Sequence, residues 1–279
     1  MFRGFYTVGS GMIAQQRKTE MLANNMANAN TPGFKAEQAS IRSFPEMYMS
    51  SIETARIPTE NGFQMKGLSP VGAVSTGVYM QETLPLFTQG QLRETELTTD
   101  VALIDGRLPT DEETGIQGAI FFRLQNEDGN EHYTKNGNFT LDASGFLTNP
   151  MGYYVLDNSG ERIALQNDDF RITSEGVIME GETAVATLGV AFAGRPDTLL
   201  KQGNGTYAME DGGNLPDANG IAGVTYSMQQ GFLEGSNVDA ARTMTDMLTA
   251  YRAFEANQKI LQAYDRSMEK AVTEVGRVN

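Results

Sequence analysis

Residues 240–275 read AARTMTDMLTAYRAFEANQKILQAYDRSMEKAVTEV, and they carry the most regular apolar pattern of the chain. Apolar residues recur there on an alternating four-three step, and only Gln258 and Asp265 place polar side chains on the seam. This spacing aligns one apolar stripe along a long amphipathic helix and is close to the heptad pattern of a coiled coil. The stripe consists of Ala240, Met244, Met247, Tyr251, Phe254, Leu261, Met268, Val272 and Val275. The stretch therefore predicts a long helix whose apolar side needs a partner.

The first thirty residues repeat this pattern more weakly, and they predict a helix from Phe2 to about Ala29. Gly9 and Gly11 weaken its early part, each by roughly 1 kcal/mol relative to alanine. The seam is formed by Phe5, Val8, Met12, Leu22, Met26 and Ala29, with Gln15 and Thr19 as its polar steps. Each terminal helix is the obvious partner for the other, or for the helices of neighbouring subunits.

Two arrangements would bury these stripes. One is the core of a helical hairpin within a monomer, and the other is a contact surface between copies. The extent of the C-terminal apolar face favours assembly, because Leu248, Ile260 and Tyr264 widen it beyond one seam. The assembly interface that we predict consists of Phe5, Val8, Met12, Leu22, Met26, Met244, Met247, Leu248, Tyr251, Phe254 and Leu261.

An asparagine-rich segment, NNMANANTPGFK at 24–35, follows the N-terminal helix. Asparagine is a poor helix former, and Pro32 biases Thr31 away from helical backbone angles. Gly33 can then adopt a turn. One interpretation is that the helix simply frays and stops. The other is that the asparagine amides form hydrogen bonds across a helix–helix contact, because so many amides are more than a stop requires.

Residues 36–75 have a mixed pattern. Ser40 to Ser51 could form a further helix, although Pro45 limits where it starts. The apolar residues on one side of that helix would be Ile41, Phe44, Met47 and Tyr48. From Arg56 to Ser75 proline and glycine recur, which predicts an extended connector with little regular structure.

From Thr76 to about Gln230 the apolar period changes to two, which is typical of strands. Asp128-Gly129 between two such segments predicts a hairpin. The polar, acidic segment from Arg107 to Gly118 predicts a loop or an insertion. Many short strands separated by regular turns predict a mostly antiparallel β domain of sandwich or barrel-like form.

The block GFLEGSN at 231–237 ends the β pattern, and Ser236 or Asn237 is the expected N-cap of the last helix. The sequence thus predicts an α+β fold in which the paired terminal helices form a discontinuous domain. Its parts are residues 1–75, the N-terminal helix and connector, residues 76–230, the β-rich outer domain, and residues 231–279, the C-terminal long helix packing with the N-terminal helix.

The bulk composition limits the partners. The 279 residues suffice for about two domains. The formal net charge of −14 argues against nucleic acid or an anionic membrane as a partner, and the acidic excess lies in the middle of the chain. The absence of cysteine excludes disulfides and thiol chemistry. No cleavable signal peptide and no run of about twenty apolar residues is visible, so we expect no membrane insertion.

The sequence offers little for catalysis, and we expect no enzyme activity, no cofactor and no metal site. His132 is the only histidine, and beside Tyr133 it is expected to be an ordinary strand residue. A His/Cys zinc site is absent without cysteine. No Gly-x-Ser-x-Gly motif supports a nucleophile, and the acidic segment 126–131 has its glycine misplaced for an EF-hand loop.

The two terminal motifs together resemble those of the bacterial flagellar basal-body rod and hook protein family. The segment 24–35 is similar to the family's N-terminal motif, and 230–238 and 251–259 are similar to its entry into the last helix. The motif residues are Asn24, Asn25, Asn28, Thr31, Pro32, Gly33, Phe34, Lys35, Gly231, Gly235, Ser236 and Asn237.

The middle of the chain resembles the β domain of the distal-rod type in the same family. This similarity rests on Gly90-Gln-Leu, 100–104, 121–122, 133–137, Phe139 and 203–213. The segment from Arg107 to Gly118 departs from the family, which usually runs on directly there. The departure suggests a paralogue with its own surface loop.

The resemblance implies an axial structural subunit of the flagellar rod. It implies terminal helices that pair, line the inner tube and polymerise, with the β domain facing outward. The implied partners are copies of the chain, other rod and hook proteins, and the flagellar type III apparatus, which would export the chain without a cleaved leader to the extracytoplasmic basal body.

A second hypothesis comes from another class of protein. The acidic centre and the tyrosines would also suit a secreted cell-wall-acting β-domain enzyme or a carbohydrate-binding module. A hydrolase of that kind would need a pair of catalytic carboxylates.

Overall fold

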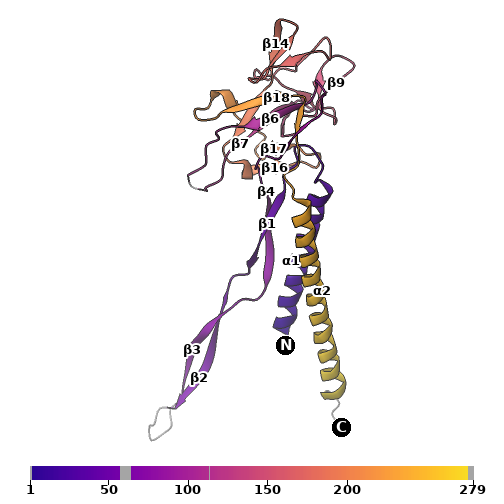
Figure 1. The fold of residues 1–279 in the computed structure, drawn as a ribbon. Coiled ribbons are helices and arrows are strands. Elements are labelled where there is room, and N and C mark those ends of the chain that lie inside the picture. The colour runs from indigo at the N-terminus through magenta and orange to yellow at the C-terminus, as the bar shows by residue number, and fades with distance from the viewer. Residues whose placement is uncertain (1, 57–63, 113, 276–279) are drawn as a thin grey trace. The chain divides into compact units, whose positions relative to one another are not determined.

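The chain forms two compact units, here called the helical unit and the β unit (Figure 1). The structure, a computed structural model, describes residues 2–56, 64–112 and 114–275. The helical unit takes its residues from 1–24, 38–83 and 241–279, and the β unit from 25–37 and 84–240. Both units therefore combine segments that are far apart in the sequence. The sequence predicted three consecutive parts, residues 1–75, 76–230 and 231–279. This division of the chain stays a prediction.

The helical unit contains the two long helices that the apolar stripes predict. They are α1 (Phe2–Ala27) and α2 (Ala240–Lys270), and α2 continues as the π-helical turn η3 (Ala271–Val275). The first helix ends two residues before the predicted Ala29, where asparagines begin to compete for the backbone hydrogen bonds. The second helix with η3 covers the predicted range.

In their described part, the first ninety residues contain four strands, and only the last of them lies in the region from Thr76 onward that the sequence predicted to form strands. They are β1 (Glu37–Ser43), β2 (Met47–Arg56), β3 (Gln64–Val74) and β4 (Val78–Pro85). β1 pairs with β4, and β2 pairs with β3 in a long antiparallel ladder that runs from Met47 opposite Val74 to Arg56 opposite Gln64. The predicted helix from Ser40 to Ser51 is therefore wrong, and so is the expectation of little regular structure in the extended connector from Arg56 to Ser75, because β3 forms there. Residues 57–63 of that connector lie outside the described residues.

Two features of these strands explain why the sequence did not reveal them. The side chains of β1 and of Met47 to Ser50 in β2 are exposed or half-buried, so no buried apolar face marks these segments as strands in the sequence. Pro70 in β3 cannot donate to a ladder, and it pairs with Ser50 where the register shifts between Met49 and Ser50. The irregularity accommodates a residue that otherwise argues against a strand.

The β unit is built from many short strands. They are β5 (Leu92–Glu94), β6 (Val101–Asp105), β7 (Ala119–Gln125), β8 (Glu131–Thr134), β9 (Thr140–Leu141), β10 (Leu147–Thr148), β11 (Tyr154–Val155), β12 (Arg171–Ile172), β13 (Val177–Glu180), β14 (Thr183–Thr187), β15 (Val190–Ala193), β16 (Leu199–Lys201), β17 (Tyr207–Met209), β18 (Tyr226–Gln230) and β19 (Phe232–Glu234). Two 3-10 turns, η1 (Pro196–Thr198) and η2 (Ala218–Gly220), connect some of them.

The largest sheet of the β unit has the order β16-β17-β8-β7-β11-β10-β9, and β15 also pairs with β7. Its pairs are antiparallel, as are β6 with β18 and β5 with β19. The α+β class with mostly antiparallel sheets is therefore confirmed. The sandwich or barrel-like form of the domain stays a prediction. In its described part, the segment from Arg107 to Gly118 forms a loop between β6 and β7, with a bridge from Thr110 to Gln117.

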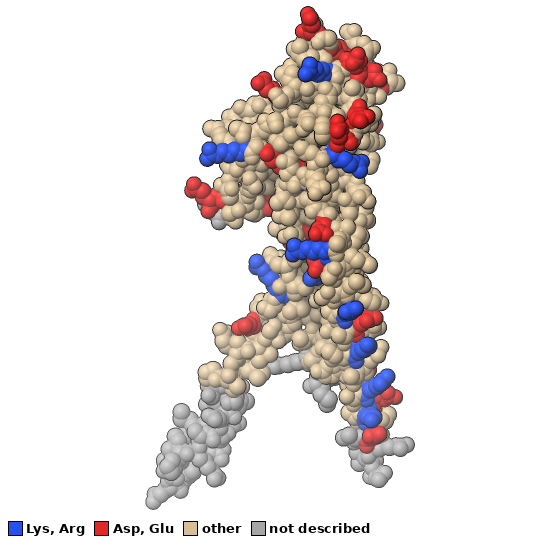
Figure 2. Space-filling view, viewed as in Figure 1, with Lys and Arg blue, Asp and Glu red and all other residues tan. Residues whose placement is uncertain are grey.

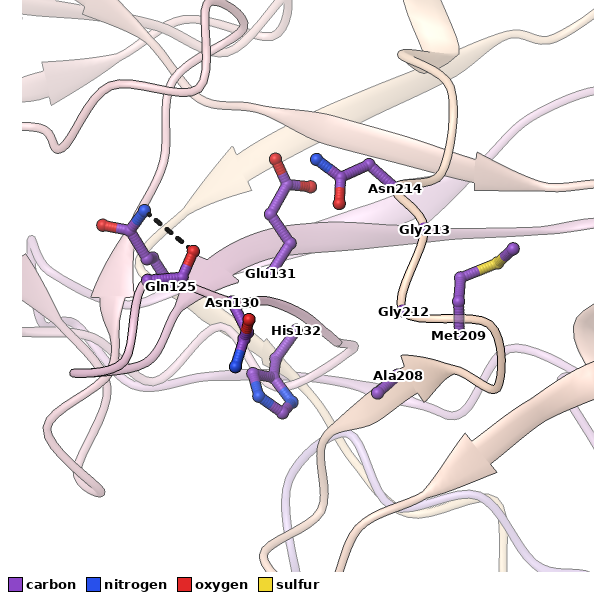
Figure 3. Close-up of a pocket in the computed structure, with 10 residues that line it drawn as sticks. Gln125, Asn130, Glu131, His132, Ala208, Met209, Gly212, Gly213 and Asn214 are labelled. Carbon is purple, nitrogen blue, oxygen red and sulfur yellow. Dashed lines mark hydrogen bonds between the residues drawn. The ribbon is translucent and has the colours of Figure 1, made fainter.

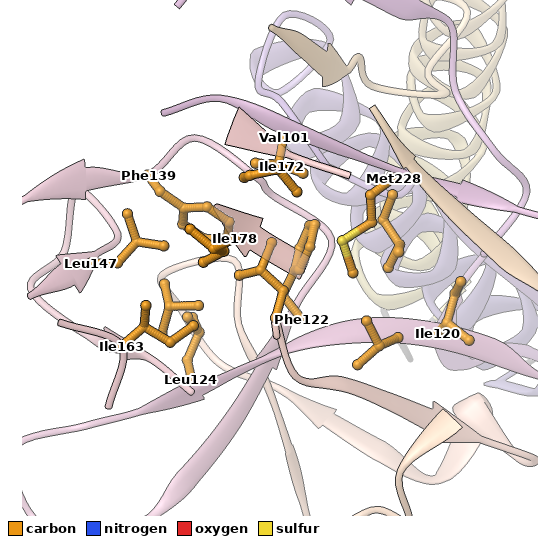
Figure 4. Packing of buried hydrophobic residues seen from close by; sticks show 14 of the residues in the cluster. Val101, Ile120, Phe122, Leu124, Phe139, Leu147, Ile163, Ile172, Ile178 and Met228 are labelled. Atoms are coloured by element: carbon orange, nitrogen blue, oxygen red, sulfur yellow. The ribbon is translucent and has the colours of Figure 1, made fainter. Parts of the chain in front are cut away.

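β7 separates two apolar clusters because successive side chains of a strand point to opposite faces. Ile120, Phe122 and Leu124 enter the larger cluster, whereas Ala119 and Phe121 enter the smaller one. In the larger cluster the rings of Phe122 and Phe139 meet edge to face at 5.2 Å (Figure 4). A strand buried on both faces reads as a mainly apolar run, and β7 opens with four apolar residues, Ala119 to Phe122.

The predicted hairpin at Asp128-Gly129 is confirmed, because β7 and β8 pair on either side of it. Gly129 has a φ of +87°, which a residue without a Cβ adopts at little cost.

Figure 2 shows acidic side chains over the β unit and both signs of charge along α2. Among the described residues, no helix is long and apolar enough to cross a bilayer.

Candidate assembly interface

The predicted interface residues of α1 are mostly covered. Leu22 is buried, with 6% of its surface exposed, and Phe5, Val8, Met12 and Met26 are half-buried. One reason is the contact with α2. A Cβ on Gly4 would collide with the Tyr264 hydroxyl, and one on Gly11 would lie 3.3 Å from Asn257 Nδ2. These two glycines therefore allow the two helices to approach closely.

α1 is also fixed to the strands of its own unit. Thr7 Oγ1 donates a hydrogen bond to the carbonyl of Thr76 at 3.0 Å. The amide of Val78, at the start of β4, donates to Ser10 Oγ at 3.2 Å. Both residues lie on α1, so the helix has polar contacts on the side of Thr7 and Ser10. These contacts fix the position of α1 against β4.

The predicted interface residues of α2 divide into two groups. Met247, Phe254 and Leu261 are half-buried. By contrast, Met244, Leu248 and Tyr251 expose 47%, 48% and 53% of their surfaces. These three residues, called the α2 ridge below, have the spacing i, i+4, i+7 and so lie on one face of the helix. A free apolar ridge of this size is costly in water and indicates a surface that is covered by something else.

The residues of the two family motifs meet inside the β unit. Lys35 Nζ donates to Glu234 Oε1 at 2.6 Å and to the carbonyl of Thr88 at 2.9 Å. Glu234 Oε1 also accepts from the amide of Gly90 at 2.8 Å. Lys35 and Glu234 are buried, with 0% and 1% of their side chains exposed. The buried ion pair therefore connects the N-terminal motif to the C-terminal motif through the segment before β5.

Asn237 makes a second connection of the same kind. Its Oδ1 accepts from the amide of Ala36 at 2.7 Å. Its Nδ2 donates to the carbonyls of Leu86 and Thr88 and to Thr88 Oγ1, at 2.8 to 3.0 Å. The prediction that Ser236 or Asn237 caps the last helix is wrong, because α2 begins at Ala240 and neither residue directly precedes it. Ser236 Oγ accepts from the amide of Val238 at 3.3 Å.

Asn25 and Gly33 shape the turn between α1 and β1. Asn25 exchanges two hydrogen bonds of 2.9 Å with the main chain of Glu37. The hypothesis of an amide contact across two helices is therefore wrong for Asn25. Gly33 has a φ of +69°, and a Cβ there would lie 2.5 Å from the amide nitrogen of Asn136. Only glycine fits this position, which explains its place in the motif.

The other motif residues lie around this centre. Phe34 is buried, and Lys201 Nζ lies 4.3 Å from the centre of its ring. Thr31 Oγ1 donates to Asn28 Oδ1 at 3.2 Å, whereas Asn24 is exposed and Pro32 half-buried. Gly231 has a φ of +77° and donates to the carbonyl of Asp100, and Gly235 donates to that of Gln91.

Burial and a neighbouring ammonium group disfavour the charged form of Lys35. Burial lowers the pKa of Lys35, and the ammonium of Lys135 lowers it further, whereas Glu234 raises it. Lys135 is itself buried and pairs with Asp105 Oδ1 at 2.6 Å. Two buried ion pairs thus lie close together in the centre of the motif. An isolated buried ammonium would be very costly, so each lysine depends on its carboxylate.

Sequence reasoning missed three of these partners. Glu234, Asp105 and Lys135 were not assigned a role, although Glu234 and Lys135 lie in segments that resemble the family and Asp105 directly follows one. One signal was available: Glu234 is a charged residue in the otherwise apolar strand Phe232-Leu233-Glu234. Its partner could not be read from the sequence, because Lys35 is 199 residues away.

A polar pocket of about 510 Å³ lies beside the β7–β8 hairpin (Figure 3). His132 lies on its wall in β8, as predicted, and burial lowers the pKa of this imidazole. The wall also carries Glu131, whose carboxylate accepts from Arg123 at 2.6 Å and from the Tyr133 hydroxyl at 3.1 Å. Among the described lining residues Glu131 is the only carboxylate, so the pocket lacks the carboxylate pair that the hydrolase hypothesis requires.

The contacts within the β unit join the two terminal motifs, and α1 and α2 both carry exposed apolar side chains, as expected of a structural protein that assembles. The chain belongs to the flagellar basal-body rod and hook protein family. Three family models match it: a flagella basal body rod protein model at residues 5–35, a flagellar hook protein FlgE/F/G D1 domain model at 115–180, and a flagellar basal body rod FlgEFG protein C-terminal model at 229–274.

Individual relatives agree with the family models. The chain is 44% identical over 278 residues to the flagellar hook-basal body complex protein FlhO of Bacillus subtilis, and the match covers 100% of both chains. It is 32% identical to the flagellar basal-body rod protein FlgG of Borreliella burgdorferi, covering 96% of this chain and 97% of the relative. It is 30% identical to the rod protein FlgF of Caulobacter vibrioides, covering 100% of both. The resemblance to the rod and hook family is therefore confirmed, and the family is one of structural proteins of the flagellar basal body.

Proposed function

We propose that this chain is an axial subunit of the flagellar rod that polymerises through α1 and α2. The observation that carries the proposal is the α2 ridge. Met244, Leu248 and Tyr251 remain half-exposed although α1 and α2 already touch at Gly4 and Gly11. A monomeric helical hairpin would leave this apolar surface in water, whereas an assembly would bury it against a neighbour.

The remaining details of the proposal follow the family. The paired helices would face the inside of the tube, and the β domain, as a sandwich or barrel-like body, would face outward. Partners would be copies of this chain and other rod and hook proteins. The chain would be exported by the type III apparatus, without a cleaved leader, to an extracytoplasmic place in the basal body. The net charge of −14 supports a solvated outer surface and no binding to nucleic acid or anionic lipid.

The subunit would be structural rather than catalytic, and it would need no cofactor. Supporting this, the carboxylate of Glu131 in the polar pocket is already paired with Arg123. The two ion pairs of the motif are buried and hold segments of the β unit together. Their positions suit a stabilising role better than a chemical one.

The introduction of a negative charge on one face of α2 tests the proposal. In a strain whose only copy carries Leu248→Asp, rods recovered from the envelope and swimming in soft agar should both be lost, because a carboxylate would be buried in the contact. The matched control is Thr249→Asp, an exposed position about 100° around the same helix from Leu248. Normal rods and swimming with Leu248→Asp would contradict the proposed interface, provided that circular dichroism shows the purified variant folded.

A further inference from the structure

A second exposed apolar surface lies on α1. It is a groove of about 640 Å³, and its walls come from α1 and from the segments that flank β2 and β4. Tyr6, Ile13 and Met47 in its walls expose 69%, 53% and 51% of their surfaces. The remaining lining residues are Phe5, Gly9, Ser10, Phe44 and Thr76, so the described lining carries no charge. This surface is called the α1 groove below.

The α1 groove faces away from the chain's own α2. With about 100° per residue, Tyr6, Gly9 and Ile13 lie roughly 140° to 180° around α1 from Gly4 and Gly11, which touch α2. The last helix of the same chain therefore leaves the groove open. Its occupant must come from another molecule.

The α2 ridge also faces away from its own partner helix. Met244, Leu248 and Tyr251 lie roughly 120° to 180° around α2 from Asn257 and Tyr264, which touch α1. The spacing i, i+4, i+7 is the anchor pattern of a helix that binds in an apolar groove. Each chain thus offers one uncharged groove and one uncharged ridge on different surfaces of its helical unit.

We propose that the α2 ridge of a second copy of this chain occupies the α1 groove. The inference deepens the proposed function, on which it rests, by assigning the two surfaces that meet. Because groove and ridge are different surfaces, the contact is heterologous, and its repetition produces a ring or an open helical array rather than a closed dimer; in the proposed rod it is the open array. This is the symmetry that a rod requires.

The size of the contact agrees with assembly in an array. At roughly 100 Å² for each half-exposed large side chain, the three ridge residues together with Tyr6, Ile13 and Met47 of the groove would bury about 600 Å² in total. A stable pair of proteins usually buries about 1,600 Å². One groove–ridge contact is therefore too small to hold two free chains together, and it becomes effective only where a subunit meets several neighbours at once.

Gly9 has a special place in this arrangement. A Cβ on Gly9 meets no heavy atom within 4 Å, so the structure has space for a larger side chain there. Glycine inside a helix is unfavourable, and replacing it would strengthen α1. In the proposed contact its small size keeps the floor of the groove open for the ridge.

The first test fills the groove. Gly9→Leu should reduce the yield of assembled rods by about tenfold or more, which is the effect of displacing one buried side chain. Gly9→Ala is the matched control, because it gives the same gain in helix propensity and leaves most of the groove open. Rods from Gly9→Leu in normal yield would overturn the proposal, whereas loss with Gly9→Leu and retention with Gly9→Ala would support it.

The second test locates the contact directly, and the absence of cysteine from the chain gives it a clean background. Isolated rods built from a chain with Gly9→Cys and Leu248→Cys should form disulfide-linked multimers on oxidation. Chains with Gly9→Cys and Thr249→Cys, whose second position lies about 100° around α2 from Leu248, should not. Rods that assemble normally but give no Gly9–Leu248 link would overturn the groove–ridge contact and leave the proposed rod function intact. Leu248→Asp with normal rods would instead contradict the function itself.

Discussion

Lys35 Nζ lies 2.6 Å from Glu234 Oε1, inside the β unit and out of contact with solvent, although the two residues are 199 positions apart in the chain. Each belongs to one of the two motifs that identify the family. The pair therefore gives these motifs a physical meaning: they close the β unit by joining the segment after α1 to the segment before α2.

The removal of the negative charge at this pair should destabilise the protein strongly. Glu234→Gln leaves the Lys35 ammonium buried without an opposite charge, and the expected loss is about 3 to 5 kcal/mol in the free energy of unfolding, measured by urea denaturation. The control is Asp246→Asn, which breaks the exposed pair with Arg242 at 3.9 Å and should cost less than about 0.5 kcal/mol. Equal losses in the two variants would show that burial of the pair does not matter.

A substitution at Gly33 should be more costly than one at a comparable turn. Gly33→Ala combines a left-handed backbone with a Cβ 2.5 Å from the amide nitrogen of Asn136, and we expect a loss of about 2 kcal/mol or more. Gly129→Ala has a similar φ of +87° but meets no atom within 4 Å, so it should lose about 1 kcal/mol. Thermal unfolding followed by circular dichroism compares them, and a smaller loss at Gly33 would contradict the close approach.

The side chain of Asn237 should stabilise the folded chain through several hydrogen bonds. Asn237→Ala leaves the amide of Ala36 and the carbonyl of Leu86 without this partner, which should cost about 1 to 3 kcal/mol of unfolding free energy. Ser236→Ala removes one local bond to Val238 and should cost about 0.5 kcal/mol. Hydrogen exchange of the Ala36 amide gives a direct readout: it should accelerate in Asn237→Ala and stay protected in Ser236→Ala.

Alkaline pH should weaken the folded state through Tyr133. Burial raises the pKa of Tyr133 to about 12. Since an unfolded tyrosine ionises near pH 10, the folded chain binds more protons between about pH 10 and 12, and this contribution to stability is complete below pH 10 and lost toward pH 12. The slope should reach at most about 1.4 kcal/mol per pH unit for this group.

A comparison of the wild type with Tyr133→Phe by urea denaturation isolates this effect. The wild type should be the more stable at pH 8, because the Tyr133 hydroxyl accepts from the amide of Leu215 at 2.7 Å, and the difference should shrink above pH 10. Tyr48→Phe, at a residue that is 85% exposed, is the matched control. A difference that stays constant from pH 8 to pH 11 would argue against a raised pKa at Tyr133.

Local sequence signals predicted the elements whose formation depends on nearby residues. The four-three step gives α2, the run Ala-Ile-Phe-Phe-Arg-Leu-Gln gives the buried strand β7, and Asp128-Gly129 gives its hairpin. In each case burial or turn geometry imposes a period that the sequence must follow. The pairing of β2 with β3 was missed because the described ends of this hairpin, Met47 to Ser50 and Pro70 to Val74, are mostly exposed, so no alternation of buried and exposed residues marks the strands.

The sequence by itself determined the two terminal helices, the antiparallel class of the β unit and the family, because each rests on a local pattern or a motif. Only the tertiary structure decided which residues of the motifs pair. Lys35 forms an ion pair with Glu234, and Asn237 accepts a hydrogen bond from the amide of Ala36, across about two hundred residues of chain. The tertiary structure also decided which apolar residues of α2 remain exposed. A periodic apolar stripe indicates that one face of a helix is buried. Which partner buries that face depends on where the other segments lie in space.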